Sequence, residues 1–239
     1  MKLLDLTLPS PAENLALDEA LLEAAEAGEL AGDVLRLWEM PQPAVIVGRS
    51  SRLAEEVAVP AVRAANVPVL RRASGGAAVV VGPGCLMYSV VLRYEGREHL
   101  RLLNQVHRHV LGIVRSALEP LVRGIEHVGM SDLAVSGRKF SGNSVRCKRD
   151  HLLYHGTLLY AFDLDLIQRL LKMPPRQPEY RSGRPHSDFV TNLKISAGDL
   201  RKALPTCFEA NQPLADWPQH RTTELVTFRY SQETWNLHR

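Results

Sequence analysis

The chain has 239 residues, of which 45% are hydrophobic and 23% charged, and its formal net charge at pH 7 is +3. This is ordinary globular composition in a chain long enough to bury a sizeable core. No apolar run approaches the roughly 20 residues that a membrane span needs, and the stretch from Met1 to Asp5 is too short for a signal peptide. Because the positive charge is small and scattered, we expect neither a nucleic-acid nor a membrane partner.

Three cysteines, Cys85, Cys147 and Cys207, are few, odd in number and widely spaced. They form no C-x-x-C pair and no metal-ligand spacing, so we expect no disulfide framework and no metal site. A reducing cytoplasm is the simplest compartment for such a chain. Cys207, on a late helix, is expected to be buried packing.

In chain order, the first part predicts a short strand at Leu3 to Leu6 and then a helix. Ser10 can cap this helix and Glu13 completes a capping box, and the helix should run to about Ala27. Asp18 and Glu19 are expected on its solvated side. Strands are predicted next at residues 34–38, 44–48, 67–72, 77–81 and 86–94.

The longest helical pattern follows at residues 98–121, where His107 and His109 point to different faces and are expected at the surface. Residues 125–162 have the pattern of an antiparallel meander, with Ser136-Gly137 as a two-residue hairpin turn. Strands mixed with helices in this irregular order predict one α+β domain over residues 1–239, with a mixed or antiparallel sheet faced by helices.

Residues 174–186 are rich in Pro and Arg and lack apolar periodicity, which predicts a long loop. Its arginines, Arg176, Arg181 and Arg184, could steer an acidic carrier domain. Further helices are predicted at 164–173 and 197–210, and Trp235 is expected to dock the C-terminal segment.

Two adjacent arginines, Arg71 and Arg72, lead into the glycine-containing stretch Ser74-Gly75-Gly76. Glycines allow a backbone to bend sharply and to approach a ligand closely. Successive N–H groups in such a bend can form an anion site, to which arginine adds positive charge. The stretch therefore predicts the floor of a pocket for a phosphate-bearing ligand, although the same glycines could equally form a hairpin turn and a bulge. Because side chains alternate along a strand, only one of the two arginines should point into the pocket.

Several motifs in a fixed order extend over nearly the whole chain. They are residues 11–19 as a first helix, Trp38 with 43–49 as a hairpin, 71–76 as R-R-x-S-G-G, 131–133 as N-D-L with one change, 139–143 as K-(I/F)-S-G-(N/S) and 155–159 as H-G-T-L-L. In these motifs the chain resembles the lipoate–protein ligase and octanoyltransferase family, which shares a catalytic domain with biotin ligases.

The resemblance implies the fold of a biotin/lipoate-ligase catalytic domain, which is similar to class II aminoacyl-tRNA synthetases. It also implies a ligase-type acyltransferase that uses ATP and Mg²⁺ to make an acyl-adenylate of lipoate or octanoate. The acyl group would then pass to a lysine of a lipoyl carrier domain, either a dehydrogenase E2 subunit or a glycine cleavage H-type protein.

The resemblance also implies roles for individual residues. Lys139 would be the catalytic cation beside the carbonyl and phosphate oxygens. Asp132 would contact the nucleotide or hold Lys139, and Gly75 and Gly76 would line the acyl groove. The positions implied in substrate or nucleotide binding are Arg71, Arg72, Ser74, Gly75, Gly76, Ala77, Asp132, Ser141, Gly142, His155, Gly156 and Thr157.

The chain also departs from the family pattern. The ligase loop usually continues with a third glycine and then a histidine–aspartate pair, and here these places hold Ala77, Val81 and Gly82. Ser131 replaces the asparagine of N-D-L. Many ligases carry a small accessory domain, for which this chain leaves no room after Trp235, so we expect a separate accessory protein or the use of a ready-made acyl-adenylate.

Two alternatives stay open. An octanoyltransferase would work through an acyl-cysteine, for which the candidates are Cys147, beside Arg146 and Lys148, and Cys85. Neither lies at the family's position just after the H-G segment. The other alternative is a relative that binds an acyl or nucleotide ligand without turnover.

Overall fold

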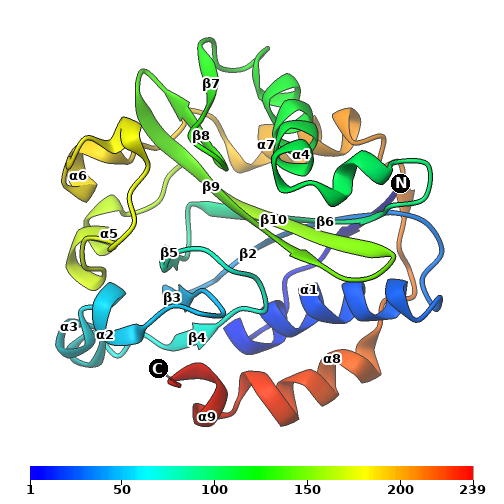
Figure 1. The fold of residues 1–239 in the computed structure, drawn as a ribbon, viewed down its shortest axis with the longest axis horizontal. Helices are drawn as coiled ribbons and strands as arrows, with labels where there is room; N and C mark the ends of the chain where they lie inside the picture. Colours follow the sequence, from blue (N-terminus) through cyan, green and yellow to red (C-terminus); the bar gives the residue numbers. More distant parts are fainter. Residues whose placement is uncertain (239) are drawn as a thin grey trace.

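A computed structural model describes residues 1–238, whose centre is an eight-stranded mixed sheet (Figure 1). The strand order is β11-β1-β2-β6-β10-β9-β8-β7. β1 is parallel to β2 and to β11, and the other neighbours are antiparallel. The strands are β1 Lys2–Asp5, β2 Val34–Glu39, β6 Cys85–Arg93, β7 Ile125–Val128, β8 Asp132–Val135, β9 Arg138–Cys147, β10 His151–Leu159 and β11 Gln212–Pro213.

A smaller three-stranded sheet lies beside the large one and has the order β4-β3-β5. It consists of β3 Ala44–Val47, β4 Val69–Arg71 and β5 Val79–Val81, with β3 parallel to β4 and antiparallel to β5. The connection from β4 to β5, residues 72–78, contains the two glycines of the predicted pocket floor and is called the glycine loop below.

Helices cover both faces of the large sheet (Figure 1). α1 packs on one face and is itself covered by α8, α4 and α7 pack on the other face, the short helices α2, α3 and α5 lie beside the small sheet, and α6 lies against α5 and β9. The α+β prediction with a mixed sheet faced by helices is therefore confirmed. The helices are α1 Pro11–Glu26, α2 Leu53–Glu56, α3 Val59–Ala64, α4 Leu103–Leu118, α5 Leu164–Leu170, α6 His186–Phe189, α7 Ala197–Cys207, α8 Gln219–Leu225 and α9 Glu233–Asn236, with single turns η1 Glu98–Arg101, η2 Glu179–Arg181 and η3 Val226–Tyr230.

Local sequence explains where key elements begin and turn. The capping box at the start of α1 is present, since Ser10 Oγ accepts from the N–H of Glu13 and the Glu13 carboxylate accepts from the N–H of Ser10. Ser136 and Gly137 both have positive φ, 50° and 70°, as a type I′ turn requires. This turn fixes the pairing of β8 with β9, on which the candidate site is built. Among residues 1–238, no helix is long and apolar enough to cross a membrane.

Several polar residues lie elsewhere than predicted. Asp18 and Glu19 are both buried. Asp18 faces the large sheet, where Arg36, Ser89 and His155 contact its carboxylate, and Glu19 lies under η3. Glu19 accepts from Arg229 and from the Tyr230 hydroxyl of η3. His107 is also buried, with Nδ1 3.0 Å from the Tyr154 hydroxyl oxygen. His109 is half-buried and Cys207 is exposed, contrary to prediction.

Asp18 forms a buried ion pair with Arg36 of β2, at 2.6 Å. Burial opposes ionisation of Asp18, but the positive charge of Arg36 and hydrogen bonds from His155 and Ser89 outweigh it and lower the pKa below its usual value of 3.8. The pair therefore joins α1 to the middle of the sheet.

We expect the Asp18→Asn variant to be less stable than the wild type by about 3–5 kcal/mol, because Arg36 would be left buried without its counter-ion. Since the pKa of Asp18 is lower in the folded than in the unfolded chain, the unfolded chain binds more protons at acid pH. The contribution of Asp18 is thus complete above pH 3.8 and is lost as pH falls through the folded-state pKa. Urea unfolding at several pH values measures this. A stability difference that is absent at pH 7 would contradict the assignment.

Candidate active site

The glycine loop is held in place by a close backbone contact with the segment after β3. The Gly76 carbonyl accepts from Ser51 Oγ at 3.1 Å, and a Cβ on Gly48 would lie only 1.9 Å from the Gly76 oxygen. Gly76 itself has a φ of +90°. Within residues 1–238, the N–H groups of residues 73–77 make no protein hydrogen bond. Gly76 and Ala77 line the sheet-side cavity described below, so their unpaired N–H groups lie where the predicted anion site needs donors.

Arg72 stabilises the glycine loop through hydrogen bonds from its buried guanidinium group. Its Nη2 donates to the carbonyl oxygens of Gly75 at 2.5 Å and Ala77 at 3.0 Å, and its Nε donates to Ser74 Oγ. Burial lowers the pKa of Arg72 to about 10, so it remains charged at neutral pH. Arg71 points the other way, to the carbonyls of Gly48 and of the C-terminal segment. The two arginine side chains therefore point in opposite directions, as the alternation of side chains along a strand predicts.

A buried hydrogen-bonded chain links the loop to the sheet. Ser74 Oγ is 2.5 Å from Nε2 of His155, and Nδ1 of His155 is 3.5 Å from the carboxylate of Asp18. Ser74 Oγ also accepts from Arg72, is almost fully buried, and lines neither of the two cavities described below. The Ser74–His155–Asp18 chain therefore holds the glycine loop in position, and Ser74 is not placed to act as a nucleophile on a ligand.

Lys139 of β9 forms an ion pair with Asp132 of β8, with Nζ 2.7 Å from Oδ1. A β-bulge makes this possible: Ala134 pairs with Lys139 and Asp132 pairs with Gly142, so all four share one face. A Cβ on Gly142 would lie 2.7 Å from Lys139 Nζ. Gly142 thus leaves the space through which the lysine side chain reaches the carboxylate.

Asp132 is held from its other side as well. Its Oδ2 accepts from the hydroxyl of Tyr180, at 2.8 Å, in the loop between α5 and α6. Burial and the charge of Asp132 raise the pKa of Tyr180, so the phenol stays protonated and remains a donor. Lys139 and Asp132 are both only partly exposed.

The H-G-T segment of β10 also makes room for a neighbour. A Cβ on Gly156 would lie 1.7 Å from Oδ1 of Asn143, which in turn accepts from the Tyr88 hydroxyl at 2.5 Å. Thr157 Oγ1 accepts from the N–H of Gly142 at 3.2 Å. His155, Gly156 and Thr157 therefore approach the Lys139 strand directly, as predicted.

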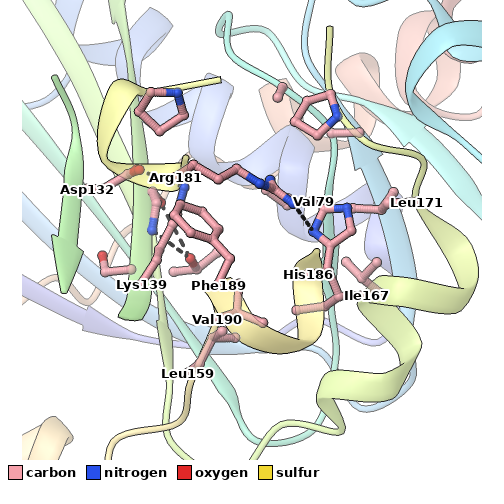
Figure 2. A pocket seen from close by; sticks show the side chains of 18 of the residues that line it. Val79, Asp132, Lys139, Leu159, Ile167, Leu171, Arg181, His186, Phe189 and Val190 are labelled. Atoms are coloured by element: carbon pink, nitrogen blue, oxygen red, sulfur yellow. Dashed lines mark hydrogen bonds and ion pairs between the residues drawn. The ribbon is translucent and has the colours of Figure 1, made fainter. Parts of the chain in front are cut away.

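Two cavities meet at Lys139 and Asp132. The helix-side cavity, about 150 Å³, lies between β9 and the helices α5 and α6 (Figure 2). The sheet-side cavity, about 260 Å³, lies between α1, the glycine loop and the strands β6, β9 and β10. Residues that line both cavities are Ala77, Ala78, Val79, Asp132, Lys139, Gly142, Thr157 and Pro178.

The two cavities differ in their remaining walls. The helix-side cavity has an apolar interior and basic side chains around it, with Arg181 stacked over the Phe189 ring at 4.6 Å and 3.3 Å from Nδ1 of His186 (Figure 2). Burial lowers the pKa of His186, which favours its neutral form. Ser141 also lines this cavity. The sheet-side walls include Leu15, Ile46, Arg72, Gly76, Met87, Asn143, Ser144, His155 and Gly156.

The loop arginines form neither a solvated loop, which was the default expectation, nor the exposed surface that steering of a carrier domain would need. Arg181 is buried, and Arg184 donates to the carbonyls of Tyr180 and Gly137. Both hold their own loop against Phe189, and only Arg176 remains exposed. Because such a loop buries cations over an aromatic ring, its Arg content reflects packing as well as charge.

No cysteine lines either cavity. Cys85 is fully buried, and burial together with the charge of Glu39 raises the pKa of its thiol. Cys147 is exposed in a surface depression with Arg49 and Arg146, behind the glycine loop. Val81, at the place of the family's histidine, is a buried strand residue paired with Ala44.

Sequence reasoning missed several residues that line the site. Asn143 stood inside the quoted Lys139–Asn143 motif, so the signal was present. Glu56 lines the helix-side cavity from the end of α2, where no local pattern indicated it. Asp18 lines neither cavity but supports the loop through His155; it was assigned to the solvated side because only its own helix was considered.

Comparison with known families agrees with this geometry. The profile of the family described as "Lipoyl protein ligase A/B catalytic domain" matches residues 10–205. The chain belongs to this family.

Curated relatives carry both names that the family covers. The chain is 28% identical to "Lipoate--protein ligase 1" of Staphylococcus aureus, over 95% of this chain and 65% of that protein. It is 27% identical to "Octanoyltransferase LipM" of Symbiobacterium thermophilum, over 96% of this chain and 94% of that protein. The chain spans slightly less than two thirds of the length of the Staphylococcus ligase.

Solved structures share the fold. A bi-partite lipoate protein ligase of Thermoplasma acidophilum, described with its E2 lipoyl domain, superposes with a TM-score of 0.83 at 24% identity, covering 100% of this chain and 97% of that chain. A lipoate-protein ligase A bound with ATP gives a TM-score of 0.80 at 25% identity, covering 99% and 98% of the two chains.

We expect Gly48→Ala to destabilise the chain by about 1–3 kcal/mol, because the added methyl group collides with the backbone oxygen of Gly76 and the loop must move. Thermal or urea unfolding measures the change. Gly112→Ala in α4 is the control, since a Cβ there meets nothing within 4 Å; it should raise stability by about 0.5–1 kcal/mol. Equal stability of Gly48→Ala and wild type would show that the loop contact is not rigid.

Proposed function

We propose that this chain attaches a lipoyl or octanoyl group to a lysine of a lipoyl carrier domain, through an acyl-adenylate made from ATP. The observation that carries the proposal is the Lys139–Asp132 pair at the junction of two cavities of different character. An acyl-adenylate has an aliphatic part, a nucleotide part and a mixed anhydride between them, and needs a site with the same three parts.

The sheet-side cavity suits the acyl part. Its walls combine the aliphatic side chains of Leu15 and Ile46 with the thioether of Met87, which adapts its shape to an apolar ligand. The free N–H groups of the glycine loop lie at its edge, through Gly76 and Ala77, where they can donate to carbonyl or phosphate oxygens.

The helix-side cavity suits the nucleotide. Val79, Phe140 and Phe189 supply apolar surface for a base. Its charged lining has more cations than anions, which favours phosphate. The cations are Lys139, Lys172, Arg176 and Arg181, and the carboxylates are Glu56 and Asp132.

Lys139 is proposed to stabilise the mixed anhydride. Its ammonium is a compact charge with three donors, which can contact a carbonyl and a phosphate oxygen together. Asp132 and Tyr180 fix its position from behind. Because the ammonium is in place before the reaction, charge that develops on these oxygens is stabilised without rearrangement.

Mg²⁺ is proposed to enter with the triphosphate. Among residues 1–238 no cluster of three or more His, Cys, Asp or Glu side chains could hold a metal. Magnesium commonly binds one or two carboxylates together with phosphates and water. Both carboxylate oxygens of Asp132 are already engaged by Lys139 and Tyr180, so the residues fit a metal held chiefly by the nucleotide.

A lipoyl carrier domain is proposed as the acceptor, with support from the Thermoplasma ligase that is described with its E2 lipoyl domain. A glycine cleavage H-type protein carries the same kind of lysine and is the second candidate. The decisive assay is mass spectrometry of an apo lipoyl domain. One tube receives lipoate, ATP and magnesium, a second receives octanoyl-acyl carrier protein, and a third receives lipoyl-adenylate.

A mass gain in the first and third tubes supports the proposal. A gain only in the third supports transfer from a ready-made adenylate, with activation left to a partner. A gain only in the second contradicts the adenylate route and assigns the chain to the octanoyltransferases. If every tube stays unmodified, the chain binds its ligand without turnover.

We expect Lys139→Met to lower the rate of carrier acylation by about 10²–10³-fold, which is the cost of losing one well-placed donor in such a site. Lys202→Met, an exposed lysine on α7, is the matched control and should keep the wild-type rate. Single-turnover mass spectrometry gives both rates. A Lys139→Met rate within a factor of two of wild type would remove this residue from the catalytic role.

Transfer through an acyl-cysteine is disfavoured by the positions of the thiols. We expect Cys147→Ser to acylate the carrier at the wild-type rate, because Cys147 lies outside both cavities. Mass spectrometry of the enzyme during turnover should show no acyl adduct that hydroxylamine removes. Such an adduct, lost in Cys147→Ser, would establish the transferase mechanism.

A further inference from the structure

A third, outer cavity of about 620 Å³ opens beside the glycine loop. Its walls come from residues 50–52, from Glu55 and Glu56, from Gly76 and Ala77, and from residues 174–176. Ala77 lines all three cavities, and Glu56 lines both the outer and the helix-side cavity. The outer cavity therefore leads to the wall of the junction where the mixed anhydride is proposed to lie.

Glu56 is the carboxylate at this wall, and it is almost fully buried. Its Oε2 accepts from the N–H of Ala78 at 2.5 Å, while Arg72 donates to the carbonyl of Ala77 in the same peptide group. One peptide of the glycine loop is thus clamped between an arginine and a glutamate. The clamp uses only one of the two carboxylate oxygens.

The second oxygen, Oε1, has no hydrogen-bond or ion-pair partner among residues 1–238. It is not fully enclosed by protein, so a ligand in the cavity can reach it. Arg72 is close enough for the charge of Glu56 to act on it, but its N–H groups donate to Ser74 and to backbone carbonyls of the glycine loop. Two further cations that line the cavities, Arg52 and Lys172, have other partners. Arg52 pairs with Glu55 at 2.9 Å, and Lys172 Nζ donates to the Ala54 carbonyl at 2.7 Å. Arg176, at the rim, is exposed. Glu56 is therefore a buried carboxylate with one free oxygen at a cavity wall.

We propose that the outer cavity admits the acceptor lysine and that Glu56 receives its ammonium and takes up one proton. The inference rests on the proposed function. A lysine amine has a pKa of about 10.4, so at neutral pH it arrives protonated and cannot attack a carbonyl. A carboxylate beside the path of entry both attracts the ammonium and removes the proton.

The step balances as follows for a bound acyl-adenylate. The ammonium gives one proton to Glu56 and becomes a neutral amine. Its nitrogen forms a bond to the acyl carbon, and the bond from that carbon to the phosphate oxygen breaks, so AMP leaves with the electron pair. The nitrogen loses its second proton to solvent, Glu56 later releases the first, and the amide remains on the carrier.

The test separates charge from structure with two substitutions. Glu56→Gln keeps an oxygen that can accept from Ala78 and so keeps the clamp, but it cannot take up a proton. Glu56→Ala removes both. Glu119→Gln is the control, because Glu119 lies directly after α4, lines none of the three cavities, and has a carboxylate already paired with Arg115 at the surface.

Wild type and variants receive preformed octanoyl-adenylate and an apo lipoyl domain in a single-turnover assay. We expect Glu56→Gln to slow transfer to the lysine by about 10²-fold and Glu119→Gln to leave it unchanged. With hydroxylamine, a nucleophile that is neutral at pH 7, Glu56→Gln should react with bound adenylate at the wild-type rate. Formation of adenylate from ATP should also be unchanged in Glu56→Gln and reduced in Glu56→Ala.

Wild-type transfer to the lysine by Glu56→Gln overturns the inference. So does loss of adenylate formation in Glu56→Gln with transfer intact, which would assign the free oxygen to the magnesium nucleotide. An equal loss with lysine and hydroxylamine would reduce Glu56 to a part of the clamp and also overturns it. If the wild-type chain transfers nothing from the adenylate, the proposed function itself fails, and this result differs from all the others.

Discussion

The buried carboxylate of Asp18 is the point at which the main segments of the molecule meet. It lies on α1, pairs with Arg36 of β2, accepts from Ser89 of β6 and faces His155 of β10. Burying an unpaired charge costs several kcal/mol, so these partners have to stay together. Through His155 the same network reaches Ser74 and the glycine loop. The floor of the candidate site is thereby fixed to the centre of the sheet.

Glycines at the site serve close packing more than backbone bending. Gly48, Gly142 and Gly156 each leave a space where a Cβ would collide with a neighbour: the Gly76 carbonyl, the Lys139 side chain and the Asn143 side chain. This explains why the motifs K-F-S-G and H-G-T carry glycine inside regular strands, where it normally weakens a sheet. Glycine makes these strands less stable, but a larger residue at Gly142 or Gly156 would prevent Lys139, Asp132 and Thr157 from lying close together on one face.

Much of the fold could be predicted because its signals are local. The capping box at Ser10 and the Ser136-Gly137 turn depend on neighbours in sequence, and both are present. Asp18 and His107 were misplaced because their partners come from distant segments. Asp18 finds Arg36 on β2 and His107 finds Tyr154 on β10, so the sheet supplies polar partners to helix positions that periodicity assigns to water; Glu19 is covered instead by η3. For the same reason no sequence pattern could indicate that Glu56 borders the site.

The helix-side cavity and the position of Lys139 depend on the same loop. Residues 174–190 form one wall of that cavity and also supply Tyr180, which holds Asp132. Asp132 in turn sets where the Lys139 ammonium lies. A nucleotide that contacts this loop would therefore also influence, through Tyr180 and Asp132, where the Lys139 ammonium lies. Under the proposed function, this arrangement gives a physical reason for one lysine to serve both half-reactions, because the carbonyl and the phosphate that it would contact belong to one anhydride.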